Sequence, residues 1–484
     1  TGNMSTGGTS IDRTDDIHPD NAQIARQAAM TVGLDVAGID FVMPDIARSV
    51  REARGGIVEV NAGPGFRMHT HPTEGHPRHV GRAVIDMLFP PGSPSRVPIV
   101  AVTGTNGKTT TSRMIAQIMK QAGKTVGMTT TDGIYIDGTQ IASGDMSGPN
   151  SAQMVLKNPA VDYAVLETAR GGILRAGLGF DRCDVAVVTN IAADHLGLRG
   201  VNTVADLAKV KSVVPQATLR DGASVLNADN EWTVEMARTA RGEIIFFSLE
   251  EENVVVRDHL RERGRVVVLR PTRHGEMITV IEHRRDTSLL LAEEIPATLN
   301  GRVRVNIANA LAAVAAALAQ DVQLEHIRHA LRGFTSNFYQ TPGRFNLMEI
   351  DGKQVMIDYC HNVAGLEAVG DFVRRFGAEK TIGVLTMPGD RRDEDIHAFG
   401  VLAGKTFDEV VIREDDDRRG RPHGQIAGVL EAAVAEAGMA PEKVTVILDE
   451  VKSGREAVAR ADKNDLVVVF ADKPAKMYAA LTGK

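Results

Sequence analysis

Residues 97–123 read VPIVAVTGTNGKTTTSRMIAQIMKQAG and combine an apolar run, a glycine-rich loop and an amphipathic segment in that order. The apolar run before Gly104 predicts a buried strand, and apolar residues recur at helical spacing between 114 and 119, with Gly123 as a stop. Backbone N–H groups of such a loop, together with the positive end of the following helix, form a cradle for phosphates. The segment therefore predicts a nucleotide-binding α/β domain.

We predict that the loop residues bind a nucleoside triphosphate: Gly104, Thr105, Asn106, Gly107, Lys108, Thr109 and Thr110. Lys108 would neutralise charge on the β- and γ-phosphates, and the Thr109 hydroxyl would bind Mg²⁺. The longer form of this loop needs a glycine where the chain has Val102, so the loop is a shorter variant. The alternative is a glycine-rich turn with an incidental lysine, which the order of strand, loop and helix disfavours.

Length and composition limit the class of protein. The chain has 484 residues, enough for about three domains. Its 55 basic and 62 acidic residues give a net charge of −7, which argues against a general nucleic-acid binder. The longest apolar stretch, near 308–319, is too short to span a membrane, and there is no secretory leader pattern. Two cysteines, Cys183 and Cys360, fit a reducing compartment, so we predict a cytoplasmic protein.

Hydrophobic patterning predicts an α/β protein with three parts. A segment rich in Pro, Gly and Ser separates the first part from the second. Apolar runs alternate with helical patterns in the second and third parts, which indicates a parallel sheet flanked by helices and then a smaller Rossmann-like domain. The predicted boundaries are 1–90, a linker at 91–98, 99–334 and 335–484. The predicted strands after the loop include 162–167, 184–191, 223–229, 381–387, 409–414, 444–448 and 465–471, and a helix at 305–320 ends the second part.

The loop sequence TGTNGKTT resembles the Mur ligase family, which joins carboxylates to amines through acyl phosphates, using ATP and Mg²⁺. Downstream segments match in the same order. The resemblance implies that Glu167 holds the nucleotide's Mg²⁺ and that His195 binds a second metal. It also implies that Lys211 is carbamylated into a metal ligand, with Lys209 as a competing candidate. With Lys108, these would form the catalytic set. Each residue also has a plainer alternative. Glu167 could cap a helix, His195 could be a hydrogen-bonded loop histidine, and Lys211 could be a solvated helix lysine.

The third part carries further resemblance to Mur ligases. TPGRFNLME resembles the segment that opens their C-terminal domain, which implies that Arg344 reaches the nucleotide phosphates. MIDYCHNVAGLEAV resembles their next element, which implies Asp358 at the ribose and His361 on the substrate side, although Val363 stands where the family carries proline. A surface salt bridge is the plainer alternative for Arg344. In the predicted helix at 305–320, Asn306 and Asn309 match asparagines that lie on the adenine side of the nucleotide in this family.

The first part carries a second set of possible metal ligands. Asp40 precedes Glu59 and Asn61, which lie two residues apart and so on one face of a strand. Carboxylate and amide oxygens of this kind bind Mg²⁺. The set resembles the metal-binding end of ATP-grasp ligases, so we interpret 1–90 as the C-terminal part of an ATP-grasp domain. Four histidines nearby are better explained as a solvated linker: His69, His71, His76 and His79.

An ATP-grasp part fused to a Mur-type part resembles the family of ligases that build cyanophycin, a polymer with an aspartate backbone and arginine side groups. The phrase NMSTGGTSID, residues 3–12, carries part of this resemblance, and we interpret the chain as an N-terminally truncated fragment. The resemblance implies arginine addition to the aspartate β-carboxyl by the Mur-type part and aspartate addition by the ATP-grasp part, which the truncation would disable. Its partners would be arginine, aspartate and the polymer or primer, in a homo-oligomer without nucleic acid or membrane.

Two other functions remain open at this level. One is a Mur-type ligase with another carboxylate acceptor, such as a peptidoglycan precursor or a folate glutamate chain. The other is a non-catalytic nucleotide-binding module. The arginine pocket is not located by the sequence, although the acidic run at 414–417 is a candidate for binding guanidinium, with a solvated acidic loop as the alternative.

Overall fold

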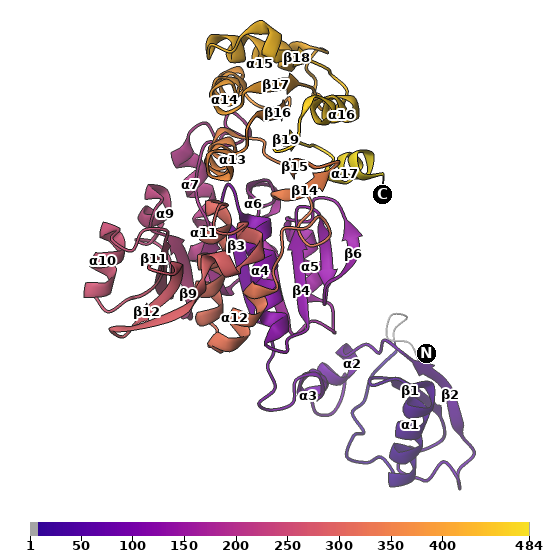
Figure 1. The fold of residues 1–484 in the computed structure, drawn as a ribbon. Helices are drawn as coiled ribbons and strands as arrows, with labels where there is room; N and C mark the ends of the chain where they lie inside the picture. The colour runs from indigo at the N-terminus through magenta and orange to yellow at the C-terminus, as the bar shows by residue number, and fades with distance from the viewer. Residues whose placement is uncertain (1–7, 484) are drawn as a thin grey trace. The chain divides into compact units, whose positions relative to one another are not determined.

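The computed structural model describes residues 8–483, so the start of the NMSTGGTSID phrase lies outside the described residues. The chain divides into two compact units, one ending at Arg96 and one beginning at Val97, which are described separately (Figure 1). No helix among the described residues has both the length and the apolar character needed to cross a bilayer.

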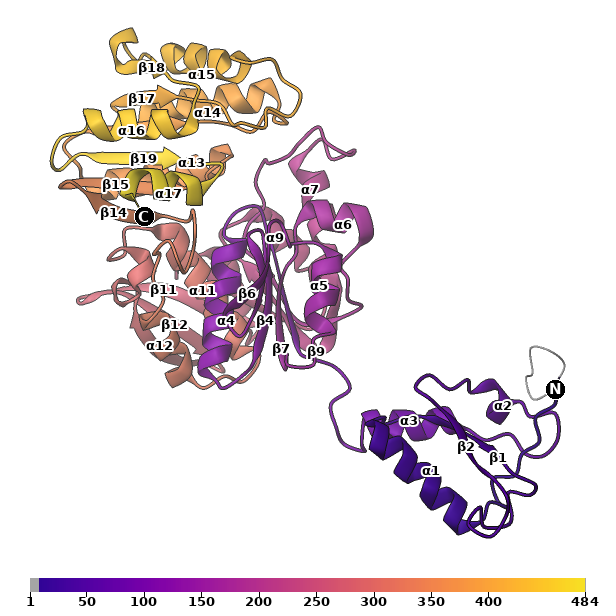
Figure 2. The same cartoon turned by 90° about the vertical axis from the view of Figure 1, so that its right-hand side faces the viewer.

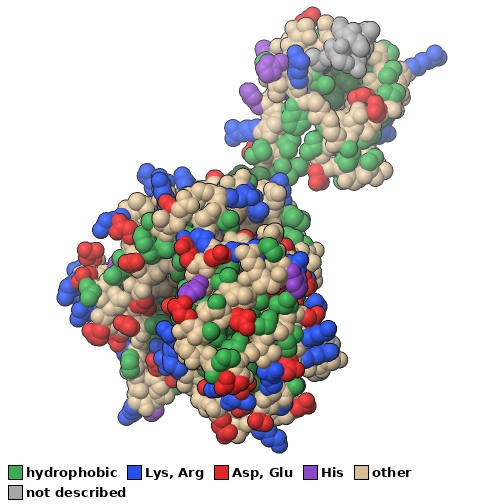
Figure 3. Space-filling model, turned by 90° about the horizontal axis from the view of Figure 1, so that it is seen from above, with side chains coloured by type: hydrophobic (Ala, Val, Ile, Leu, Met, Phe, Trp, Pro, Cys, Tyr) green, Lys and Arg blue, Asp and Glu red, His purple; other side chains and the backbone are tan. Residues whose placement is uncertain are grey.

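Within its described residues, 8–96, the first unit contains three helices and a two-stranded antiparallel sheet. Strand β1 (Gly38–Val42) pairs with β2 (Gly56–Asn61). The three helices are α1 (Pro19–Val32), α2 (Arg67–Thr70) and α3 (Val80–Leu88). Buried Asn21 holds the loop after β1, because its side chain donates to Ile46 O and Arg48 O. Apolar side chains remain at the surface (Figure 3), and among the described residues of this unit no hydrophobic side chain is fully buried.

The second unit begins with an 11-stranded sheet in the order β13-β12-β11-β10-β9-β8-β3-β7-β4-β5-β6. The seven strands from β11 to β4 are parallel, as predicted, but both edges are antiparallel, so the prediction of a parallel sheet is wrong there. Short hairpin turns join the edge strands, which cannot be parallel neighbours without a crossover. The strands are β3 (Ile99–Thr103), β4 (Val126–Thr130), β5 (Gly133–Ile136), β6 (Thr139–Ser143), β7 (Tyr163–Glu167), β8 (Cys183–Val188), β9 (Thr218–Asn227), β10 (Glu243–Ser248), β11 (Arg265–Thr272), β12 (Gly275–Glu282) and β13 (Arg285–Leu291).

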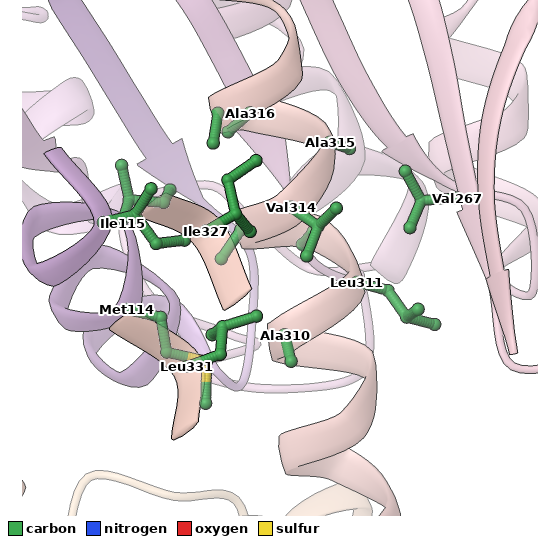
Figure 4. Packing of buried hydrophobic residues seen from close by; sticks show 14 of the residues in the cluster. Met114, Ile115, Val267, Ala310, Leu311, Val314, Ala315, Ala316, Ile327 and Leu331 are labelled. Atoms are coloured by element: carbon green, nitrogen blue, oxygen red, sulfur yellow. The ribbon is translucent and has the colours of Figure 1, made fainter. Parts of the chain in front are cut away.

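Helices cover both faces of this sheet (Figure 2). They are α4 (Lys108–Gln121), α5 (Pro149–Leu156), α6 (Arg170–Ala176), α7 (Val204–Lys211), α8 (Val213–Gln216), α9 (Glu231–Met236), α10 (Val254–Arg261), α11 (Arg304–Leu318) and α12 (Leu324–Arg332), with 3₁₀ turns at Ala292–Glu294 and Pro296–Thr298. The alanine-rich α11 is buried on nearly every side, because small side chains let α4, α12 and the strands approach it closely. Figure 4 shows Met114 of α4, Ile327 of α12 and Val314 of α11 meeting in this core.

The remainder of the second unit is a smaller α/β domain, as the patterning predicted. Its six strands lie in the order β14-β15-β19-β16-β17-β18, and all but β14 are parallel. The strands are β14 (Asn346–Ile350), β15 (Lys353–Asp358), β16 (Thr381–Leu385), β17 (Glu409–Ile412), β18 (Val444–Val446) and β19 (Leu466–Phe470). The helices are α13 (Val363–Phe376), α14 (Asp393–Thr406), α15 (Gln425–Glu436), α16 (Glu450–Arg460) and α17 (Pro474–Thr482), with a 3₁₀ turn at Pro441–Lys443.

Candidate active site

A cavity of about 540 Å³ lies at the carboxyl ends of β3 and β7, the edge at which parallel α/β sheets bind ligands. The whole loop from Gly104 to Thr110 lines it. The cavity also collects the other predicted residues of the second unit: Glu167, His195, Lys211, Asn306, Asn309, Arg344, Asp358 and His361. The smaller domain supplies the last three, so both domains of this unit build one site.

The loop has the backbone that a phosphate cradle needs. Gly104 and Gly107 have φ values of 143° and 86°, in the region that favours glycine. A Cβ atom would collide with the Thr189 hydroxyl at the first position and with the Asn309 side chain at the second. Lys108 is the first residue of α4, and its Nζ donates to Thr105 O at 3.0 Å. This lysine therefore lies at the loop rather than in the core.

Glu167 ends β7 and lies beside the start of α4. Thr109 Oγ1 donates to Glu167 Oε2 at 2.9 Å, and Thr131 N donates to the same oxygen at 3.2 Å. The other oxygen, Oε1, is buried and has no hydrogen-bond partner among the described residues. Burial raises the pKa of this carboxyl, against the positive charge of Lys108. An unpartnered carboxylate oxygen next to a hydroxyl is a donor set that suits a hard cation such as Mg²⁺.

Lys211 is buried at the end of α7, and its Nζ donates to Gly104 O at 2.6 Å. Burial, with the charge of Lys108 as a second cause, lowers the pKa of this lysine to about 7. Its amine is therefore substantially neutral near neutral pH. The competing candidate Lys209 is exposed and is not among the residues that line the cavity, which leaves Lys211 as the candidate.

His195 belongs to a cluster that joins the two domains. Its ring nitrogen Nδ1 lies 3.0 Å from Arg391 Nη1, and Nε2 lies 3.2 Å from Nη2. Ligand atoms of Asp194, His195 and His361 lie within 4.8 Å of one another, a spacing that a metal ion could bridge. Burial lowers the pKa of His195 to about 4, so the ring is mainly neutral at pH 7, and a metal could bind it only where it replaces Arg391 at one ring nitrogen.

Asp194 carries the negative charge of this cluster. Burial would raise its pKa, but the neighbouring His361, His195 and Arg391 outweigh that effect and hold the pKa well below its usual range. Arg391 Nη2 lies 3.1 Å from Asp194 Oδ1. The sequence analysis missed both residues, although Asp194 directly precedes His195 and Arg391 follows a buried strand of the smaller domain.

The smaller domain also contacts the phosphate loop directly. Asn106 Nδ2 donates to Asn362 Oδ1 at 3.0 Å, and Asn362 Nδ2 donates back to Asn106 Oδ1 at 3.1 Å. Asn362 also caps α13, accepting from Gly365 N at 2.8 Å. Val363 is then the first helical residue, a position that tolerates proline, so valine there leaves the cap intact.

Four other predicted residues have partners within the protein. Arg344 lies 5.0 Å above the Tyr359 ring and donates from Nη1 to Gly343 O. Buried Asp358 accepts from Phe345 N at 2.8 Å, and burial raises its pKa. Asn306 donates to Ala297 O, and Asn309 donates to Asn306 Oδ1, so the two asparagines of α11 that line the cavity are also bonded to the protein.

The predicted ligands of the first unit lie on its two-stranded sheet. Asp40 is the register partner of Glu59, and Asn61 lies two residues further along the same strand. Both carboxylates are exposed. The histidines at 69–79 lie within the first unit, in α2 or between α2 and α3, so the prediction that they belong to a linker is wrong.

The acidic run at 414–417 has a buried half and an exposed half, so the solvated-loop alternative holds for Asp416 and Asp417 but not for the first two residues. Glu414 is buried and accepts from Gly424 N, Ile426 N and Ala427 N at the start of α15. Asp415 is buried against Arg413 at 3.0 Å, Asp416 pairs with Lys473 at 2.7 Å, and Asp417 pairs with Arg419 at 3.4 Å. Glu414 and Asp415 therefore stabilise the smaller domain from within, and the run does not form an open guanidinium site.

Two family models match the second unit. Residues 102–317 match the Mur ligase middle domain, and residues 343–472 match the Mur ligase glutamate ligase domain. Cyanophycin synthetases of Crocosphaera subtropica and Geminocystis herdmanii are 47% and 48% identical over 97% of this chain. The chain spans about half the length of these relatives, 53% in each. A UDP-N-acetylmuramoyl-L-alanyl-D-glutamate–2,6-diaminopimelate ligase of Clostridium botulinum is 27% identical over 81% of this chain and 76% of its own length.

Solved structures share the fold. A bifunctional folylpolyglutamate synthase/dihydrofolate synthase with Mn, AMPPNP and L-glutamate bound has a TM-score of 0.59 at 19% identity, covering 80% of this chain and 90% of its own. A Mycobacterium tuberculosis folylpolyglutamate synthase, complexed with ADP and AMPPCP, has a TM-score of 0.56 at 21% identity, covering 83% of this chain and 94% of its own.

Proposed function

Because the chain belongs to the Mur ligase family, we propose that its second unit is an ATP-dependent amide ligase that adds arginine to the β-carboxyl of aspartate in cyanophycin. The supporting observation is the shared cavity, which brings the phosphate loop together with Glu167, His195 and Lys211. The similarity to cyanophycin synthetases supports arginine and an aspartate polymer as the substrates.

The chemistry explains why these side chains would be needed together. In forming an acyl phosphate, an acceptor carboxylate oxygen attacks the γ-phosphorus, the bond to ADP breaks, and two anions must approach each other. Lys108 would offset phosphate charge, and Thr109 with Glu167 would hold Mg²⁺, which screens charge when bound. His195 and Lys211 would supply ligands on the acceptor side. The arginine amine then displaces phosphate and forms the amide.

Incubation of the protein with ATP, Mg²⁺, arginine and a poly-aspartate primer tests the proposal. We expect release of ADP that depends on both arginine and the primer. Activity only with another amino acid or acceptor would favour a peptidoglycan- or folate-type ligase. Nucleotide binding without turnover on any acceptor would favour a non-catalytic module.

Arg344→Ala should raise the KM for ATP by about tenfold and also lower kcat, since Arg344 would bind the phosphates as the two domains close. The measurement is ADP release at varied ATP concentration. Arg302→Ala is the matched control, because Arg302 also stacks on an aromatic ring, Phe376 at 5.5 Å, but does not line the cavity. ATP kinetics equal to wild type would mean that Arg344 has no role at the nucleotide.

For the first unit we propose part of an ATP-grasp domain in which Asp40, Glu59 and Asn61 bind Mg²⁺ for aspartate addition. Their support is the pairing of Asp40 with Glu59 across the sheet. We also propose that the protein is cytoplasmic and forms a homo-oligomer. Light scattering of the purified protein would test the oligomeric state.

A further inference from the structure

Three arginines that the proposed chemistry does not use lie on the wall of the cavity: Arg170, Arg175 and Arg199. Within residues 8–483, none of the three forms an ion pair with a carboxylate. Other cavity-lining arginines differ, since Arg391 pairs with Asp194 and Asp390, and Arg419 pairs with Asp390. Asp194 and Asp390 lie close enough to act on Arg170 electrostatically, but no carboxylate forms an ion pair with any of the three within residues 8–483.

Arg170 has the most constrained environment of the three. It begins α6, three residues after Glu167, and is 9% exposed. Its Nη2 donates to Leu198 O at 2.6 Å, but its Nε is buried without a hydrogen-bond partner among the described residues. A buried guanidinium with an unsatisfied N–H group is unfavourable unless an anion completes it. An anionic ligand at this wall is the simplest explanation.

Arg199 is presented by a tight loop that Arg170 helps to hold. Gly197 N donates to Val201 O at 2.8 Å and closes the loop, while Arg170 binds the carbonyl of Leu198. Arg199 itself has φ of 55°, in the left-handed region that tight turns use. Arg175 is exposed at the far end of the same short helix.

We infer that these three arginines bind a second carboxylate of the acceptor, next to the carboxylate that reacts. The nucleotide phosphates already have the loop, Lys108 and Arg344, so the other anion that enters the cavity is the acceptor. Guanidinium groups suit carboxylates because they donate two parallel hydrogen bonds. The inference rests on the proposed function, in which the acceptor is an acidic peptide, and adds that this peptide needs two adjacent carboxylates. All three arginines contact the second carboxylate, and Arg170 in addition holds the loop that carries Arg199.

The test measures binding of a fluorescent aspartate peptide to the 484-residue protein with Mg²⁺ and a non-hydrolysable ATP analogue. Arg175→Gln and Arg199→Gln should each weaken binding by about tenfold or more, and leave the affinity for the ATP analogue unchanged. Arg220→Gln is the control, because Arg220 is exposed on β9 and is not among the residues that line the cavity. In turnover assays, the KM for primer should rise while kcat at saturating primer changes little.

A second peptide, amidated at its terminal carboxylate, shows which group the arginines bind. Amidation should weaken binding to the wild type about as much as Arg199→Gln does, and should have little further effect on that variant. Equal loss on amidation in both proteins would overturn the inference, as would unchanged binding by both variants. Failure of the proposed function is distinct: it is the lack of arginine-dependent ADP release by the wild type.

Discussion

Lys108→Ala is expected to reduce ATP turnover by at least about 100-fold while the fold stays intact. Lys108 begins α4 at the loop, and among the described residues its Nζ has a single hydrogen-bond acceptor, the backbone oxygen of Thr105. It is half-buried and outside the hydrophobic core. Removing it therefore takes positive charge from the phosphate site without opening a cavity in the packing.

The measurement is ADP release with arginine and primer, together with the midpoint of thermal unfolding. Lys120→Ala is a suitable control, because Lys120 lies in the last turn of the same helix and pairs with Asp137 at 3.1 Å. The control should keep its activity. Half of wild-type arginine incorporation in Lys108→Ala would refute the role of this lysine.

The phosphate loop could be predicted because its signals are local. Strand, glycine positions and helix follow one another within residues 97–123, and the structure gives both glycines the φ values that exclude other residues. The strands at 162–167 and 184–191 were also predictable, since fully buried parallel strands are continuous apolar runs. The antiparallel edges of the sheet could not be predicted in this way. Their short strands are only partly apolar, and their direction depends on the hairpin turns that join them.

The contacts between the two domains could not be predicted, because they join residues far apart in the sequence. Asn106 and Asn362 exchange hydrogen bonds across 256 positions, and Arg391 meets His195 across 196. No periodic pattern encodes such a pair. At the acidic run 414–417, local composition was misleading. It indicated an open anionic surface, whereas Glu414 is buried and caps α15.

Lys211→Ala should be nearly inactive, and short carboxylates such as acetate should partly restore it. A protonated lysine would repel Mg²⁺, so Lys211 can act as a metal ligand only after modification. Its amine has the reactivity that modification needs, because burial lowers its pKa to about 7. Reaction with CO₂ converts the neutral amine into a carbamate, releasing a proton, and the product carries oxygen donors that suit a hard metal.

The lowered pKa of Lys211 predicts how activity depends on pH. Above about pH 7 the amine is mainly neutral and can be carbamylated, while below it the amine is protonated and the carbamate should be lost. We therefore expect activity and a ¹³C carbamate signal, measured by NMR under ¹³CO₂, to fall together as the pH drops through 7. The NMR signal is a readout that does not depend on turnover.

Two variants separate this role from a structural one. Lys211→Arg should be inactive and resist rescue, because it keeps the positive charge and leaves no room for a carboxylate in a position that is 3% exposed. Lys209→Ala changes an exposed lysine of the same helix and should retain activity and the ¹³C signal. Robust activity of Lys211→Ala without additives would show that the buried amine serves only its hydrogen bond to Gly104 O, which holds the phosphate loop against α7.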